Sequence, residues 1–443
     1  MPRFPRRPAA PSSRTRRLTR FARSEDGGMT IFALYVLAGA LMASAFAVDF
    51  AYLQSARTQL QVAADSAAHA ALYYRETHTA AEAKDKAVEV ARHDMPTEGF
   101  GTVLSADDIE FGYWDSAQRT FTANPYSVSA VRVSPARAQE SGNPVTTFLF
   151  KLLNHAEWDI RAEAVFVTYR PPCMSEGFVA EGVVDIQSNN AYFDGFCLHS
   201  NTYVSINSNN FFEPGTVVSM PDLALLDIPK SGFDTNEGLQ MALRRGYYRL
   251  RVLNKIDRIE ADLTWGSGPY VPDYIYSPAP VHVAGTTLDG ADFTPNRINY
   301  VDCSRGRVTI DGHVKNLVIM ANCELKFAQG ALLENVVVFN GSTDAKSINS
   351  PNGFQVGLND NCASGGGAQI ITRGGMNVAS SLQLYGSQLI ALGDIEFAAN
   401  AEGLQGASLI AGGIISGTSN MNMGFCGSGM EDNFTANYFR LVL

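Results

Sequence analysis

The stretch GGMTIFALYVLAGALMASAFAV, residues 27–48, decides how this chain is organised, because it contains no charged residue. As a helix rising about 1.5 Å per residue, it would reach about 33 Å, enough to cross a hydrocarbon core about 30 Å thick. Asp49 ends the stretch, and eight arginines stand before it: Arg3, Arg6, Arg7, Arg14, Arg16, Arg17, Arg20 and Arg23. A basic flank on one side only predicts that the N-terminus stays in the cytoplasm and that everything after Asp49 is translocated.

A cleaved signal peptide is the main alternative, since Ala43-Ser44-Ala45 fits the small-x-small pattern of a cleavage site. The apolar stretch is longer than a usual signal-peptide core, and its helical pattern continues past that site, which favours a retained anchor. A buried helix of a soluble protein is the third reading. Cleavage stays open at this point.

Composition fits a globular body behind this anchor. The chain has 443 residues, of which 46% are hydrophobic and 18% charged, with a formal net charge of −10. Because the arginines cluster before the apolar stretch, we expect them to fix topology rather than to bind nucleic acid. The expected parts are a cytoplasmic basic tail (1–26), a transmembrane helix (27–48), a periplasmic module (49–170) and a mainly β domain (173–443).

The module of residues 49–170 carries an α+β pattern. Apolar residues, mostly alanine, recur at three- and four-residue steps from Phe50 to Tyr74, and the helical pattern ends at Pro96. Strand patterns follow at 109–114, 119–122, 130–133 and 160–167, with a short apolar helix or amphipathic lid at 147–153. The pattern predicts a pilin-like module in which a small sheet packs on a long helix leaving the membrane.

Four motifs in this region form an ordered series: Glu25-Asp26-Gly27-Gly28, then TIFAL at 30–34, Ala47-Val48-Asp49 and RTQLQVAADSAA at 57–68. Together they resemble the N-terminal module of Tad/Flp pilus-assembly proteins of the TadE/TadG type, over about residues 23–75. The resemblance implies a single-pass protein of a bacterial inner membrane that supports assembly of a thin adhesive pilus. Its implied partners are other pilus-assembly proteins or pilins, and it implies no enzyme.

The chain is more similar to TadG than to TadE. Prepilins carry a glutamate at the fifth residue after the processed glycine, whereas the fifth residue after Gly28 is Ala33. Many TadG-type chains end in a von Willebrand A-like domain with an Asp-x-Ser-x-Ser metal motif. The nearest string here, DCSRG at 302–306, lacks the second serine, so we expect a different distal domain.

From Gly177 onward, short apolar runs alternate with Gly/Asn turns at steps of 19–20 residues. Ser188-Asn189-Asn190 recurs at 208–210, and Ile370, Ile390 and Ile410 head successive runs. This period predicts a right-handed parallel β-helix, or solenoid, with asparagines hydrogen-bonded along a ladder of turns and the three isoleucines stacked inside it. A helical insertion is expected near 236–263. An antiparallel sandwich is the alternative.

Six cysteines, all after the apolar stretch, are disulfide candidates. Their even number suits an oxidising compartment, and no Cys-x-x-Cys spacing indicates a metal site. Sequential pairing is the simplest of about 15 connectivities, and the sequence leaves the choice open. The candidates are Cys173, Cys197, Cys303, Cys323, Cys362 and Cys426.

The sequence predicts no catalytic, cofactor or metal site, and we expect no small-molecule substrate. The acids that a solenoid enzyme could use are interpreted as turn caps: Asp185, Asp194, Asp302, Asp311, Asp394 and Glu396. The predicted function is therefore structural, as an accessory of Tad pilus assembly acting through protein contacts. The alternatives are an envelope-anchored carbohydrate-binding or carbohydrate-active β-helix protein, and a minor subunit of the pilus tip.

Overall fold

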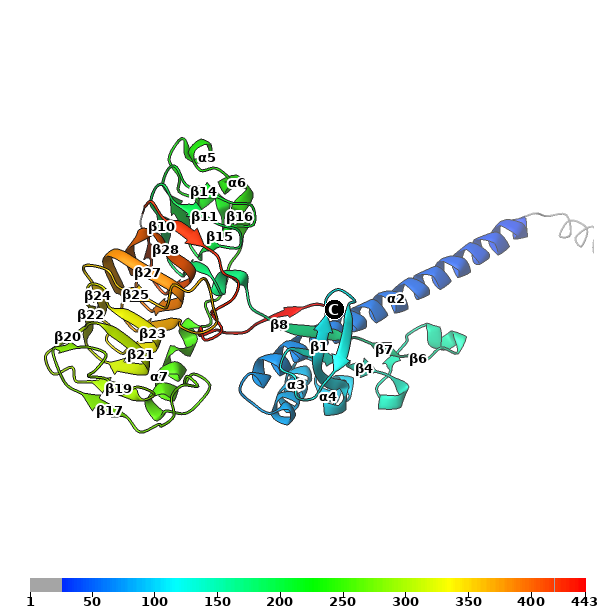
Figure 1. The fold of residues 1–443 in the computed structure, drawn as a ribbon. Helices are drawn as coiled ribbons and strands as arrows, with labels where there is room; N and C mark the ends of the chain where they lie inside the picture. Colours follow the sequence, from blue (N-terminus) through cyan, green and yellow to red (C-terminus); the bar gives the residue numbers. More distant parts are fainter. Residues whose placement is uncertain (1–25, 418) are drawn as a thin grey trace, which may run out of the picture. The chain divides into compact units, whose positions relative to one another are not determined.

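The chain forms two compact units in the computed structural model, which describes residues 26–417 and 419–443 (Figure 1). One unit ends at Tyr169 but also includes Phe439–Leu443, and the other is Arg170–Tyr438. The basic tail expected at 1–26 lies outside the described residues except for its last one.

A 50-residue helix, α2 (Asp26–Arg75), is the main element of the first unit. A second helix, α3 (Ala80–Asp94), packs beside it, and the short α4 (Thr97–Phe100) follows. The helical stretch is divided into α2 and α3 because Thr79 caps the start of a new helix. The Thr79 N–H donates to the Glu82 carboxylate at 2.9 Å, and the Thr79 hydroxyl accepts from the Glu82 N–H at 3.3 Å.

A five-stranded sheet covers the buried side of α2. Its spatial order is β2-β1-β3-β8-β31, and the β1–β2, β1–β3 and β3–β8 pairs are antiparallel. The alanine-rich face of α2 lets the helix approach the sheet closely, as the sequence predicts. The strands are β1 (Ile109–Asp115), β2 (Thr120–Ala123), β3 (Ala130–Val133), β8 (Ala164–Tyr169) and β31 (Tyr438–Leu441).

Two strand pairs and three 3₁₀ turns complete the first unit. The elements are β4 (Ala136–Arg137) with β7 (Ile160–Arg161), β5 (Val145–Thr146) with β6 (Glu157–Trp158), η1 (Ala106–Asp108), η2 (Gln139–Ser141) and η3 (Phe150–Leu153).

The C-terminus returns to this sheet. The Val442 N–H donates to the Val165 carbonyl at 2.9 Å, and the Val165 N–H donates to the Leu443 carbonyl at 3.0 Å. The distal domain expected at 173–443 therefore does not run to the end of the chain, because the last strand finds its partner in β8.

The second unit is a parallel β-helix, which confirms the solenoid and excludes the sandwich. Each coil stacks on the next with parallel pairing. The first group of strands, after η4 (Pro172–Met174), is β9 (Gly177–Ala180), β10 (Val184–Ile186), β11 (Ala191–Tyr192), β12 (Cys197–Ser200), β13 (Val204–Ile206), β14 (Phe211–Phe212), β15 (Val217–Met220) and β16 (Leu243–Arg245).

A second group of strands builds the rest of the stack. It comprises β17 (Val281–Val283), β18 (Thr287–Leu288), β19 (Ile298–Val301), β20 (Arg307–Ile310), β21 (His313–Ala321), β22 (Glu324–Phe327), β23 (Leu332–Asn340), β24 (Ile348–Ser350), β25 (Gln355–Val356), β26 (Ala368–Thr372), β27 (Met376–Ala391), β28 (Ile395–Ala411), β29 (Ile415–Ser416) and β30 (Asn422–Gly424).

The order of coils in space differs from their order in the sequence. Strand β9 pairs with β12 on one side and with β28 on the other. From β9 the chain runs through β12 and β15 to β16 at one end of the stack, and it re-enters at β17. It then returns coil by coil to β28, so the solenoid both begins and closes in its middle, at a seam between β9 and β28.

The helical insertion expected near 236–263 is only partly helical. Short elements precede and fill this region. In chain order they are η5 (Leu223–Leu225), α5 (Gly232–Thr235), α6 (Leu239–Ala242), β16, η6 (Leu253–Lys255) and the ten-residue α7 (Ile256–Trp265). One continuous helix is excluded at Gly238, whose φ is 81° and where a Cβ would lie 1.9 Å from the Phe212 carbonyl oxygen.

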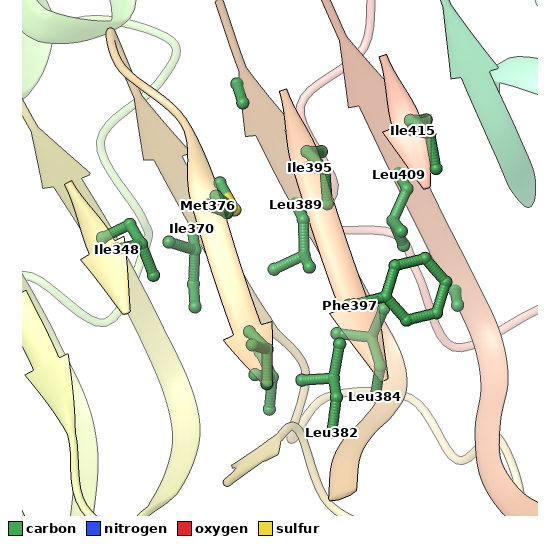
Figure 2. Packing of buried hydrophobic residues seen from close by; sticks show 14 of the residues in the cluster. Ile348, Ile370, Met376, Leu382, Leu384, Leu389, Ile395, Phe397, Leu409 and Ile415 are labelled. Carbon is green, nitrogen blue, oxygen red and sulfur yellow. The ribbon is translucent and has the colours of Figure 1, made fainter. Parts of the chain in front are cut away.

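The interior of the solenoid is filled by stacked apolar side chains. Ile370, Leu389 and Leu409 are successive neighbours in β26, β27 and β28 and point into this core (Figure 2). The prediction that Ile370, Ile390 and Ile410 share one inward ladder is wrong. The step from β26 to β27 is 19 residues, so Ile390 pairs with Ile371, and a slip of one residue moves a side chain to the opposite face.

Ile371, Ile390 and Ile410 are nonetheless fully buried, because the outer face of these strands is covered. The covering residues include Ile256 and Ile259 of α7, together with Phe434 and Ala436, in one apolar cluster. Both faces of the sheet are therefore core here, which gives the near-continuous apolar runs of the sequence.

A ladder of turn asparagines crosses the seam, as the repeat predicts. The Asn190 N–H donates to the Asn210 side-chain oxygen at 2.9 Å, and the Asn210 N–H donates to the Asn236 oxygen at 2.8 Å. The Met421 N–H donates to the Asn190 oxygen at 3.1 Å. Each amide side chain thus supplies the acceptor that the next turn would otherwise lack.

Candidate functional site

The exposed half of α2 is the first candidate site. Every described side chain from Gly28 to Val48 is exposed, whereas the same helix is buried at intervals from Leu53 onward. Among the residues that the structure describes, α2 is the one helix long and apolar enough to cross a membrane. Met29, Phe32 and Tyr35 are among the large, exposed apolar side chains of this region.

Asp49 marks the change from the exposed to the buried half of α2. Its side chain is 0% exposed. Its carboxylate accepts three backbone hydrogen bonds, from Phe148 and Leu149 at 2.8 Å each and from Phe150 at 2.6 Å. These N–H groups open the 3₁₀ turn η3, whose first donors have no partner inside the turn. Asp49 therefore fastens the predicted lid of residues 147–153 to α2.

Aromatic side chains surround this junction. The rings of Phe46 and Phe150 are 5.7 Å apart, those of Tyr52 and Phe148 are 4.9 Å apart, and Phe150 stacks on Trp158 at 5.5 Å. Sequence reasoning locates the lid but misses its link to Asp49, because 99 residues separate Asp49 from Phe148 and no local pattern connects them.

The six cysteines form three disulfides, and their pairing is sequential. Cys173–Cys197, Cys303–Cys323 and Cys362–Cys426 close loops with separations of 24, 20 and 64 residues. All three lie in the solenoid unit.

Two of the acids singled out in the sequence, Asp302 and Asp311, cap turns, and a third, Asp394, links neighbouring coils. Asp302 accepts from the Ser304 N–H at 2.9 Å, Asp311 from the Gly312 N–H at 2.7 Å, and Asp394 from the Ile414 N–H at 2.7 Å. Asp302 and Asp311 satisfy backbone donors close along the chain, which is how aspartate serves turns, whereas the N–H that Asp394 binds lies 20 residues away.

The structure brings two other acids onto one outer face. Asp185 and Glu396 both pair with Ser416, from opposite sides, so they stand two strands apart, or about 10 Å. Glu396 accepts from the Asn377 amide at 2.7 Å, and Asp185 accepts from Gln187 at 3.3 Å. Asp194 lies elsewhere, with its N–H donating to Glu213. The seam creates this proximity, which no periodicity indicates.

A buried glutamate that sequence reasoning missed lies near the seam. The Glu176 side chain is 0% exposed and accepts hydrogen bonds from the N–H groups of Cys426 and Gly427. Burial raises the pKa of this carboxyl, and the two hydrogen bonds oppose that rise.

One cavity of about 260 Å³ on the solenoid combines acids with aromatic rings. Its lining includes Tyr270 and Tyr274 before β17 and Glu431, Asp432 and Phe434 near the C-terminus. Burial, together with the neighbouring carboxylates of Glu431 and Asp273, raises the pKa of Asp432. Within 26–417 and 419–443, no group of three or more His, Cys, Asp or Glu side chains is placed to hold a metal ion.

Comparison with known families assigns both units. Residues 27–83 match the family of Flp pilus-assembly TadE/G-like proteins, and residues 62–165 match that of Tad-like Flp pilus-assembly proteins. Residues 177–427, more than half of the chain, match a domain of unknown function, DUF7867. No curated protein matches the chain. The chain therefore belongs to the DUF7867 family and carries that β-helix behind the N-terminal module of the TadG-like Tad/Flp pilus-assembly family.

Proposed function

We propose that this protein is an inner-membrane accessory of Tad pilus assembly, held by residues 27–48 and acting in the periplasm through protein–protein contacts. One observation carries the proposal: a helix with an exposed apolar half continues directly into a module that matches Tad pilus-assembly families. The helix supplies the anchor and the module the link to the pilus pathway.

Charge and redox chemistry support the orientation. The arginines before residue 27 favour a cytoplasmic N-terminus by the positive-inside rule. Three disulfides favour an oxidising compartment for the solenoid. The proposed role is not enzymatic, and in it the acids of the solenoid satisfy turns and backbone donors.

Topology and phenotype test the proposal together. Alkaline phosphatase fused after Leu443 should be active, because the enzyme folds only outside the cytoplasm, and a strain lacking the protein should lose its filaments. Replacing residues 27–48 by a cleavable signal peptide should release the body and abolish filament formation. The matched control replaces the same residues by an unrelated apolar helix of equal length, which should keep the protein in membranes.

Two outcomes would contradict this role. An inactive phosphatase fusion would reject the orientation, and wild-type filaments in the deletion strain would reject the link to assembly. Recovery of the protein mainly in sheared surface filaments, rather than in membranes, would assign it to the pilus tip instead.

Glycan binding is a second candidate function, favoured by the cavity that Tyr270, Phe434 and Asp432 help to line. Aromatic faces and carboxylates together suit sugar rings and their hydroxyl groups. Binding of cell-surface polysaccharide to the full chain should then weaken in Asp432→Asn and remain unchanged in Asp85→Asn, an exposed position on α3.

A further inference from the structure

We propose that the hairpin tip of residues 147–156 is a second membrane contact, which inserts Phe148 and Leu149 into the interface of the leaflet facing the body of the protein. The inference rests on the proposed anchor, and it adds a binding surface for lipid. The tip joins β5 to β6, and η3 lies within it.

Exposure points to a partner outside the chain. Phe148 is 51% exposed and Leu149 is 38% exposed, although the backbone of both residues is fixed to Asp49. The hairpin base is secured independently, since the Thr147 N–H donates to the Ala156 carbonyl at 2.9 Å. Two large apolar side chains are thus held outward at a rigid site, where water is an unfavourable neighbour.

Position identifies that partner as lipid. The tip contacts α2 around Asp49, the first charged residue after the apolar stretch, and its rings touch Phe46 and Tyr52 of the same helix. The exposed apolar stretch of residues 28–48 therefore meets the tip where Phe46 contacts Phe150. A helix crossing the hydrocarbon core would place this level at the membrane–water interface, where aromatic side chains concentrate.

The chemistry of the tip suits an interface rather than the hydrocarbon core. Lys151 and His155 are exposed on the same loop, and Trp158 at its base is half-buried between Phe150 and α2. Such mixed surfaces lie with their apolar side about 5–10 Å deep in the boundary between headgroups and acyl chains.

Two membrane contacts would fix the orientation of the module, which one helix cannot do. A single span leaves the attached module free to rotate and tilt, whereas a second insertion point fixes its orientation about the helix axis. Asp49 links the two contacts, because it belongs to α2 and binds three consecutive N–H groups of the tip.

Depth-dependent fluorescence quenching tests the proposal on the full chain. The background carries Trp114→Phe, Trp158→Phe and Trp265→Phe, which removes all three native tryptophans. Phe148→Trp then reports on the tip, and Tyr126→Trp, at a position 88% exposed in the same unit, is the matched control. Both are reconstituted in vesicles of phosphatidylethanolamine and phosphatidylglycerol containing brominated phosphatidylcholine.

The Phe148→Trp chain should lose fluorescence to bromines placed high on the acyl chains more than to deep ones, and it should resist aqueous iodide. The Tyr126→Trp chain should be quenched by aqueous iodide and should lose little fluorescence to bromines at either depth. A third chain that keeps Trp158 and has only the other two tryptophans replaced leaves the tip unaltered, and it should also be quenched by shallow bromines.

Three results would overturn the inference. Equal iodide quenching at positions 148 and 126 would place the tip in water. Protection from both quenchers would mean that protein covers it, either a second copy or another partner. A chain that fails to float with vesicles would reject the anchor itself, whereas a chain that floats with an iodide-accessible tip rejects only the second contact.

Discussion

The carboxylate of Glu176 accepts a hydrogen bond of 2.7 Å from the N–H of Cys426, a residue 250 positions further along the chain. This contact and the neighbouring one from Gly427 hold the segment after β30 against the start of the solenoid. A fully buried acid therefore takes part in closing the seam.

Glu176 should make stability depend on pH. Its folded pKa is raised by burial, so the folded state binds a proton more tightly than the unfolded state does. The stabilisation from this proton is complete below the unfolded pKa and is lost as pH rises through the folded pKa. Urea unfolding from pH 4 upward should show the wild type losing stability relative to Glu176→Gln over this window. Parallel pH profiles would contradict the assignment.

Leu389 and Ile390 should be equally sensitive although they face opposite sides of β27. Leu389 is 1% exposed in the inner core and Ile390 is 0% exposed under the outer cover. Leu389→Ala and Ile390→Ala should each cost about 2–5 kcal/mol in the free energy of unfolding.

Leu392 is the matched control for this pair. It follows the same strand and is 39% exposed, so Leu392→Ala should stay within about 0.5 kcal/mol of the wild type. If Ile390→Ala behaves like Leu392→Ala in urea titrations, the outer face is not covered as described.

The disulfides should differ in their contribution to stability. In the chain-entropy account, the 64-residue separation of Cys362–Cys426 contributes about 4 kcal/mol and the 20-residue separation of Cys303–Cys323 about 3 kcal/mol. Thermal unfolding of the two double Cys→Ser variants should therefore rank Cys362/Cys426 as the less stable. Thiol labelling of the unfolded, unreduced wild type checks the premise, since any free thiol would contradict complete pairing.

Asp49→Ala should release the tip of residues 147–156 without unfolding the sheet. The N–H groups of Phe148, Leu149 and Phe150 lose their shared acceptor, so their hydrogen exchange should become faster. The strands β1 and β3 should keep their protection. Asp85→Asn on the exposed side of α3 serves as the control and should change neither region.

The sequence predicts those parts of the structure that repeat or that form between residues close along the chain. The long helix, the β1–β2 hairpin, the solenoid and its asparagine ladder all follow from local periodicity. The register of Ile390 does not, because β26 and β27 are 19 residues apart rather than 20, and strands buried on both faces give nearly continuous apolar runs that do not reveal a shift of one residue. The hydrogen bonds of Asp49 and Glu176 could not be predicted for another reason: their partners are backbone N–H groups, which no residue pattern identifies.

The seam also determines when the solenoid can be completed. Asn189 bonds to Asn420 across it, 231 residues away, and β9 gains its second neighbour only after β28 has been synthesised. Contacts this distant in sequence form slowly, because a long loop must close first. A chain truncated before β28 would not be a shorter solenoid with one open end. It would hold two partial stacks, each with an additional unpaired strand edge that invites aggregation.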